Sequence, residues 1–206
     1  MSELLQHTFS VFLAFFAIMN PIANTAVFVG LTGNEEQSTQ KKIAFKALII
    51  TFFIMMTFAI LGNTIFHLFG ITLPALRITG GILVFLIGYQ MLHGENSKMH
   101  KPKENNDADI AISPLAVPIL AGPGTIATAM NYSATGDWAE IIVTISAFSV
   151  LCLFTYVCFI FGQRLIRFIG VSGVSIVTRL MGLILAVIGM QMLLEGVFGA
   201  ISDYNG

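Results

Sequence analysis

The chain has 206 residues, of which 56% are apolar and only 10% are charged, and its formal net charge is −1. Soluble domains carry about 25% charged residues, so this composition excludes a water-soluble domain and indicates a polytopic membrane protein. The sequence has no basic patch interleaved with aromatic residues, so we expect no nucleic-acid partner.

Apolar segments that approach or exceed the roughly 20 residues needed to cross a bilayer occur along the whole chain. The sequence therefore predicts an all-α, polytopic membrane protein with six transmembrane helices. These helices are expected at residues 4–31, 43–69, 73–93, 112–133, 138–161 and 174–199. The first segment lacks the positive flank of a secretory signal peptide, so we expect it to be retained. The residues between 162 and 173 are expected to form a connection.

The two halves of the chain resemble each other. Three residue pairs recur at nearly constant spacing: Pro21 and Pro123 (102 residues), Arg77 and Arg179 (102 residues), and Gln90 and Gln191 (101 residues). Each half holds three expected spans, and an odd number of crossings inverts the second copy, as in many secondary transporters. We therefore predict two inverted three-helix repeats, at 1–94 and 111–206, joined by a cytoplasmic linker at 95–110.

The basic residues predict the orientation of the chain, because Lys and Arg accumulate on cytoplasmic loops. If the N-terminus is outside, nine of the ten basic residues fall at the cytoplasmic side or its edge, and only Arg77 falls outside. We therefore expect a multi-pass plasma-membrane protein with both termini external. Arg77 and Arg179 are interpreted mainly as interfacial anchors, with lipid binding, a carboxylate partner or gating as alternatives.

The first expected span contains a proline near its centre. Pro21 removes a backbone hydrogen bond, and a broken helix survives in hydrocarbon only where protein or a water-lined cavity satisfies its polar groups. Asn20 can act as an N-cap with Pro21 at the first helical position. Asn24 and Thr25 follow and add polar groups to this break.

The fourth expected span repeats this arrangement. Gly122 and Pro123 occupy the corresponding positions, followed by Gly124 and Thr125, and Thr128 continues a polar face of the helix. Each break would create a helix N-terminus with free N–H groups and leave free carbonyls on the preceding half-helix. Such a pair suits a small zwitterion, whose carboxylate faces the N–H groups and whose ammonium faces the carbonyls.

Other interpretations of these segments remain open. A proline in a spanning helix can produce only a kink, and the two segments could instead be re-entrant hairpins. Small residues in two further spans are explained by close helix packing: Gly81 and Gly88 in the third, and Gly182, Ala186 and Gly189 in the sixth. We find no ligand spacing for a metal, no nucleotide-binding loop and no catalytic motif, so we expect no metal, no cofactor and no enzymatic activity.

The motifs at the two breaks resemble those of a known family. Met19-Asn20-Pro21-Ile22-Ala23-Asn24, Ala121-Gly122-Pro123-Gly124-Thr125 and the six spans resemble the MarC family of bacterial and archaeal inner-membrane proteins. The resemblance covers nearly the entire chain, and it implies a multi-pass protein with small neutral amino acid transport as the activity associated with some members. Ala23 stands where many relatives have glycine, which makes the first break less permissive.

We therefore predict a secondary transporter, a carrier or exporter of small polar solutes such as neutral amino acids. Its site would lie near the bilayer midplane between the breaks, and the copies would rock against each other to alternate access. The expected site residues are Asn20, Pro21, Asn24, Thr25, Gly122, Pro123, Gly124, Thr125 and Thr128. A channel and a non-transporting membrane scaffold are the alternatives. The expected partners are a small-molecule substrate and the lipid bilayer, with a homo-oligomer as a further possibility.

Overall fold

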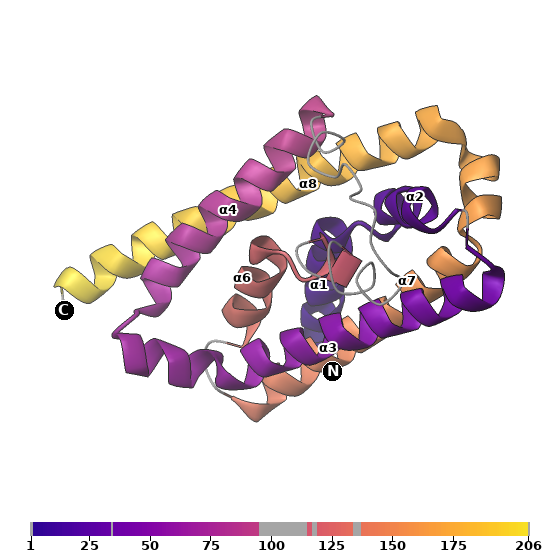
Figure 1. Ribbon diagram of the computed structural model, residues 1–206. Helices are drawn as coiled ribbons and strands as arrows, with labels where there is room; N and C mark the ends of the chain where they lie inside the picture. The colour runs from indigo at the N-terminus through magenta and orange to yellow at the C-terminus, as the bar shows by residue number, and fades with distance from the viewer. Residues whose placement is uncertain (1, 34, 95–114, 117–118, 134–136, 206) are drawn as a thin grey trace.

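The computed structural model describes residues 2–33, 35–94, 115–116, 119–133 and 137–205, and these residues are helical with short connections (Figure 1). No strand occurs among them, which confirms the predicted all-α class. The helices are α1 (Ser2–Met19), α2 (Pro21–Thr32), α3 (Gln37–Phe69), α4 (Leu73–His93), α6 (Pro123–Tyr132), α7 (Trp138–Ile160) and α8 (Gly162–Asn205).

Five helical segments of the described residues are long and apolar enough to cross a membrane. They are Gln6–Thr32, which joins α1 and α2, and Gln37–Gly62, Leu73–His93, Trp138–Ile160 and Gly162–Tyr204. The remaining expected span, 112–133, is only partly described, and its helical part α6 has 10 residues. The predicted linker at 95–110 lies outside the described residues. The chain is therefore an integral membrane protein of several apolar helices.

Two antiparallel helix pairs lie along opposite sides of the molecule (Figure 1). In the first pair, α4 packs along α8 over most of its length, with Gly81 opposite Gly189 and Gly88 opposite Gly182. In the second pair, α3 packs against α7, and the rings of Phe45 and Tyr156 meet with centroids 6.4 Å apart.

The α4–α8 pair depends on small residues. A Cβ atom added at Gly88 would lie 2.5 Å from the backbone nitrogen of Ala186 and 2.6 Å from the carbonyl oxygen of Gly182. The backbones therefore approach each other closely, which confirms the interpretation of the glycine stripes. In lipid such contact supplies the dispersion energy that holds two helices together, because apolar side chains gain nothing by leaving the acyl chains.

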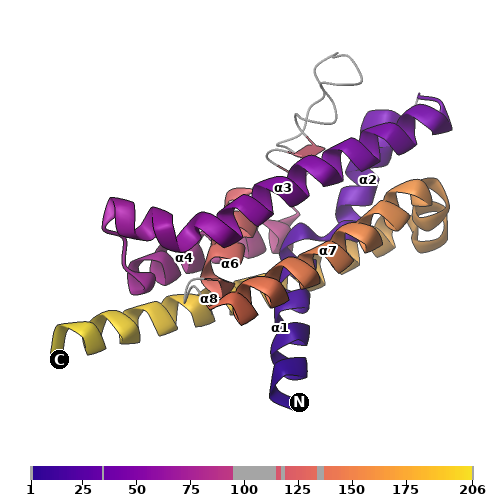
Figure 2. The ribbon, with the colours of Figure 1, turned by 90° about the horizontal axis from the view of Figure 1, so that it is seen from below.

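The shorter helices α1, α2 and α6 lie between these two pairs. α1 and α2 are seen nearly end-on in Figure 1 and lengthwise in Figure 2, so they run across the long helices. α2 packs mainly on α7 and α8, whereas α6 packs mainly on α3 and α4. Each short helix is thus held chiefly by long helices, and α2 is held by helices from the other half of the chain.

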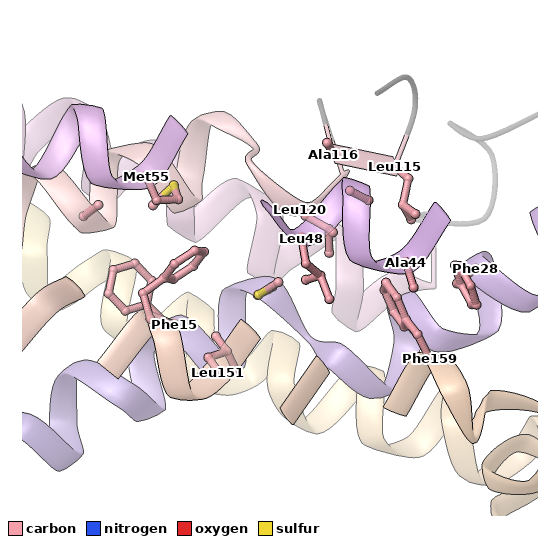
Figure 3. Close-up of a cluster of buried hydrophobic side chains, with 14 of the residues drawn as sticks. Phe15, Phe28, Ala44, Leu48, Met55, Leu115, Ala116, Leu120, Leu151 and Phe159 are labelled. Carbon is pink, nitrogen blue, oxygen red and sulfur yellow. The ribbon is translucent and has the colours of Figure 1, made fainter. Parts of the chain in front are cut away.

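The largest core cluster forms where α1, α2, α3 and α7 meet (Figure 3). Phe15 and Phe148 pack edge to face with ring centroids 5.1 Å apart, and Phe28 and Phe159 stack at 4.5 Å. Leu120, which directly precedes the second break, is fully buried in the same cluster. The core therefore holds the segments around the breaks inside the protein.

The expected connection at 162–173 is largely helical, because α8 already begins at Gly162. The chain turns instead at Gly170, whose φ of 73° and ψ of 162° belong to a region that glycine alone adopts readily. Arg164 and Arg167 gave this segment the polarity of a loop, but both side chains are exposed and so are compatible with a helix. α3 begins at Gln37, six residues before the expected span at 43–69.

We expect Gly88→Ala to lower the thermal unfolding midpoint, because backbone atoms meet the new methyl group and the two helices must separate at a cost of about 1–3 kcal/mol. Gly30→Ala is the matched control, since a Cβ at Gly30 meets nothing within 4 Å and alanine favours the helix by about 0.5–1 kcal/mol. The midpoints are measured by intrinsic fluorescence of purified protein in detergent. Equal midpoints for the two variants would contradict the close α4–α8 contact.

Candidate functional site

The first break lies at Asn20, between α1 and α2. Asn20 has φ 39° and ψ 70°, the left-handed conformation, which asparagine tolerates better than most residues. Its side-chain oxygen accepts a hydrogen bond from the N–H of Ala23 at 3.3 Å, and Pro21 is the first residue of α2. The predicted cap is therefore confirmed, and the first span is a broken helix rather than a kinked one.

A side chain of α2 satisfies one backbone group that this break leaves free: the Asn24 side-chain nitrogen donates to the carbonyl of Met19, the last residue of α1, at 2.5 Å. The Thr25 hydroxyl donates to the carbonyl of Pro21 at 2.7 Å, which is a bond within α2 itself. The side-chain nitrogen of Asn20 (Nδ2) has no hydrogen-bond partner among the described residues, although Asn20 is only 4% exposed. This nitrogen is the donor that the first break leaves available.

The second break lies at Gly122, before α6. Gly122 is extended, with φ −74° and ψ 165°, and Pro123 is the first helical residue, as predicted. The N-cap residue Gly122 has no side chain, so among the described residues the amides of the first turn of α6 lack the partner that Asn20 supplies to α2. The helix dipole places a partial positive charge here, so this end suits an anionic group better than the end of α2 does.

The structure brings the two breaks together. A Cβ atom added at Gly124 would lie 2.7 Å from Cδ1 of Ile18, which is two residues before Asn20, and 2.6 Å from Cδ1 of Ile87 on α4. Thr125 and Thr128 follow on α6 and are 3% and 2% exposed. The region between the breaks is thus inside the protein and is closed by two isoleucine side chains.

Two predicted residues lie away from this meeting point. A Cβ atom added at Gly162, between α7 and α8, would lie 3.0 Å from Cγ2 of Thr25, so Thr25 faces that junction. Pro123 is exposed, whereas Pro21 is buried. Asn20, Gly124 and the first turn of α6 are therefore the predicted elements that the fold places closest to both breaks.

Sequence reasoning missed the residues that close the site and some polar neighbours. Ile18 and Ile87 carry no signal, because isoleucine is common in every transmembrane helix. Thr155 on α7 is fully buried, and its hydroxyl lies 3.9 Å from the sulfur of Met19 beside the first break. The hydroxyl of Thr51 on α3 is buried without a partner among the described residues. Both threonines interrupt apolar runs, which was the available signal.

A small hollow lies elsewhere, between α1, α3, α6 and α7. Phe15, Phe52, Met55 and Phe148 are among its mainly apolar lining residues, so it offers little to a polar solute. In the part of the chain that the structure describes, no group of three His, Cys, Asp or Glu residues is placed to hold a metal ion. Among the buried polar residues of the described structure, Asn20, Thr125 and Thr128 lie at or next to the two helix breaks.

Comparison of the sequence with known protein families identifies one family. The sequence pattern of "MarC family integral membrane protein" matches residues 5–201, which is nearly the whole chain and includes both breaks. The chain belongs to the MarC family.

Relatives from bacteria and archaea support this membership. The MarC family protein described here is 40% identical to the UPF0056 membrane protein YvbG of Bacillus subtilis over 199 residues, which covers 92% of this chain and 93% of YvbG. It is 38% identical to a UPF0056 membrane protein of Pyrococcus horikoshii, with coverage of 90% and 91%. It is 30% identical to the UPF0056 inner membrane protein MarC of Salmonella typhimurium, with coverage of 91% and 92%. No solved structure matches the chain.

We expect Asn20→Ala to destabilise this MarC family protein more than Asn20→Gly. Alanine cannot cap α2, and its left-handed backbone costs about 1–2 kcal/mol of stability. Glycine adopts that backbone readily, and as a cap it costs only about a few tenths of a kcal/mol. Thermal unfolding in detergent measures the difference. If both variants unfold at the same temperature, the left-handed conformation at Asn20 is not required.

Proposed function

We propose that this MarC family protein is a secondary carrier of small polar solutes, with neutral amino acids as the first candidates, in the plasma membrane. The observation that carries the proposal is the pair of helix breaks that meet inside the protein, beside Ile18 and Gly124. Interrupted helices persist at membrane depth only where protein or a water-filled cavity surrounds them, and transporters commonly bind substrate at such points.

Two sets of contacts support an inverted repeat. In the sequence Gly81 corresponds to Gly182 and Gly88 corresponds to Gly189. In the structure each glycine lies opposite the other one's counterpart, Gly81 opposite Gly189 and Gly88 opposite Gly182. This reciprocity is what a two-fold relation between similar units produces. The equivalent helices α4 and α8 also run antiparallel, as inversion across the membrane plane requires.

The short helices support the same relation. A Cβ atom at Gly62 would lie 3.6 Å from Cγ of Met130 on α6, and one at Gly162 would lie 2.7 Å from Cγ2 of Val29 on α2. The two contacts correspond to each other, because Gly162 lies 100 positions after Gly62 and Met130 lies 101 positions after Val29. The turns at Gly70, with φ 63°, and Gly170, with φ 73°, are also 100 residues apart.

The charges of the chain support an orientation with both termini outside, because nine of the ten basic residues then lie on or near the cytoplasmic face. The surface of α8 suits a lipid environment. Phe168, Val187 and Phe198 are 90%, 62% and 68% exposed, and an apolar surface of this extent is stable only against acyl chains or a partner.

The chemistry of the two breaks favours a zwitterionic solute. The uncapped first turn of α6 and the free amide nitrogen of Asn20 both donate hydrogen bonds, which suits a carboxylate. Gly122 and Gly124 allow the solute to approach the backbone closely. An ammonium group would take the carbonyls at the end of α1, one of which now accepts from Asn24.

Transport requires the closed region to open towards each side in turn. α2 packs on α7 and α8, and α6 packs on α3 and α4, so rocking of one intact half against the other would separate these contacts. We propose instead that the α4–α8 pair moves as a unit, carrying Ile87 away from Gly124. The close glycine contacts hold α4 and α8 together in this motion.

The first test is uptake of labelled glycine, alanine and serine into vesicles that contain the protein. We expect Gly124→Ala to reduce uptake about tenfold or more, because one added methyl group narrows the space between Ile18 and Ile87. Gly30→Ala is the control and should transport as the wild type does, since its methyl group meets nothing within 4 Å. Equal uptake by all three proteins would place the site elsewhere.

The second test separates a transport protein from a scaffold by asking whether water reaches the breaks. Asn24→Cys and Thr125→Cys are made in a protein whose Cys152 and Cys158 are replaced by alanine. In a carrier or channel we expect a small impermeant thiol reagent to label both positions from at least one side of the membrane. Inert cysteines at both positions would favour a scaffold, and counter-flow with unlabelled substrate separates a carrier from a channel.

A further inference from the structure

Polar side chains from several helices gather at the C-terminal end of α6, away from the helix breaks. The Nε of Arg77 on α4 donates a hydrogen bond to the side-chain oxygen of Asn131 at 3.1 Å. This bond joins residues 54 positions apart and leaves the two terminal nitrogens of the guanidinium available. Arg77 is half-buried, so its cation is held at a defined place rather than free in solvent.

An acidic group lies at the same level of the α4–α8 pair. A Cβ atom at Gly196 would lie 2.8 Å from the backbone nitrogen of Ile78, which places Glu195 beside the turn of α4 that carries Arg77. Gln191 donates to Glu195 at 3.1 Å, and both side chains are exposed, so the carboxylate of Glu195 lies at the surface of α8. No ion pair between Arg77 and Glu195 occurs in the described structure, so the two opposite charges are separate.

His7 on α1 borders the same region. Its ring meets that of Tyr132 edge to face, with centroids 6.1 Å apart, and its Nε2 is buried without a hydrogen-bond partner among the described residues. A buried polar atom without a partner is costly, typically about 1–3 kcal/mol. A bound molecule or water at this position would satisfy it.

The corresponding end of α2 lacks this chemistry. At a spacing of 101 residues, Asn131 and Tyr132 correspond to Gly30 and Leu31. At these two positions the short helix of the first half brings no polar side chain, and its last residue Thr32 donates its hydroxyl within α2, to the carbonyl of Phe28. The polar groups at the end of α6 are not needed to build the fold.

We propose that His7, Arg77, Asn131, Tyr132 and Glu195 form a second binding site, for a zwitterion that carries an anionic group and a primary ammonium. Arg77 receives the anion with its terminal nitrogens, and Asn131 holds the guanidinium in place. Glu195 and the carbonyl end of α6, which carries a partial negative charge, receive the ammonium. The two sources of this chemistry are a free amino acid and the headgroup of phosphatidylethanolamine.

The proposal is tested by binding alone. Purified protein is placed in phosphatidylcholine nanodiscs, and binding of labelled glycine is measured by equilibrium dialysis for the wild type, Arg77→Gln and Glu195→Gln. We expect each substitution to weaken binding about tenfold, because each removes one charge-assisted contact. Arg179→Gln is the matched control, since Arg179 corresponds to Arg77 in the other half and is exposed, and it should bind as the wild type does.

Binding of the lipid headgroup is tested in a separate experiment. Thermal midpoints of the same proteins are compared in phosphatidylcholine nanodiscs with and without phosphatidylethanolamine. A midpoint that rises with phosphatidylethanolamine for the wild type and Arg179→Gln, but not for Arg77→Gln or Glu195→Gln, supports the site with a lipid as its ligand. If neither ligand distinguishes these two variants from the wild type, or if Arg179→Gln behaves as they do, the proposal is overturned. Because the carrier proposal also expects glycine to bind at the helix breaks, the dialysis is done in the Gly124→Ala background, which narrows that site and leaves the binding that depends on Arg77 and Glu195. The thermal midpoints measure neither transport nor solute binding, so the lipid result is independent of the carrier proposal.

Discussion

The structure depends on one requirement, which is that the backbone groups freed by a helix break inside an apolar protein must find partners. At the first break the side chain of Asn20 accepts from the N–H of Ala23, and the side chain of Asn24 donates to the carbonyl of Met19. At the second break the N-cap residue Gly122 has no side chain, so the same requirement is left to the surrounding protein or to a bound molecule. The two breaks are therefore alike in starting a helix at a proline, but their N-cap residues differ in backbone conformation and in chemistry.

The long helices provide the surroundings in which such breaks can persist. The α4–α8 pair is held by direct backbone approach at Gly81, Gly88, Gly182 and Gly189, whereas the α3–α7 pair is held by larger side chains such as Phe45 and Tyr156. α1, α2 and α6 fill the space between the pairs, and Ile18 and Ile87 close it at Gly124. A rigid pair next to a more adaptable one offers a physical route to opening, because side-chain contacts rearrange more easily than backbone contacts.

Much of this fold could be predicted from the residues, and the exceptions have clear causes. The caps at Asn20 and Gly122 and the glycine stripes were predictable because proline, asparagine and glycine impose local backbone geometry whatever surrounds them. The helix that begins at Gly162 was not, because Arg164 and Arg167 resemble a loop unless their exposure is known. The internal use of Asn24 was also hidden, since an amide that binds a solute and one that binds its own backbone look the same in sequence.

The sequence by itself determined that the chain is an all-α membrane protein with paired interruptions, because composition and local backbone preference act without distant partners. Only the tertiary structure decided that the interruptions meet, that Ile18 and Ile87 cover Gly124, and that Arg77 reaches Asn131. These contacts join residues that are distant in the sequence: Ile87 and Gly124 are 37 positions apart, and Ile18 and Gly124 are 106 positions apart. Such contacts follow from how whole helices pack, and helix packing depends on the shapes of several surfaces at once rather than on any short stretch of residues.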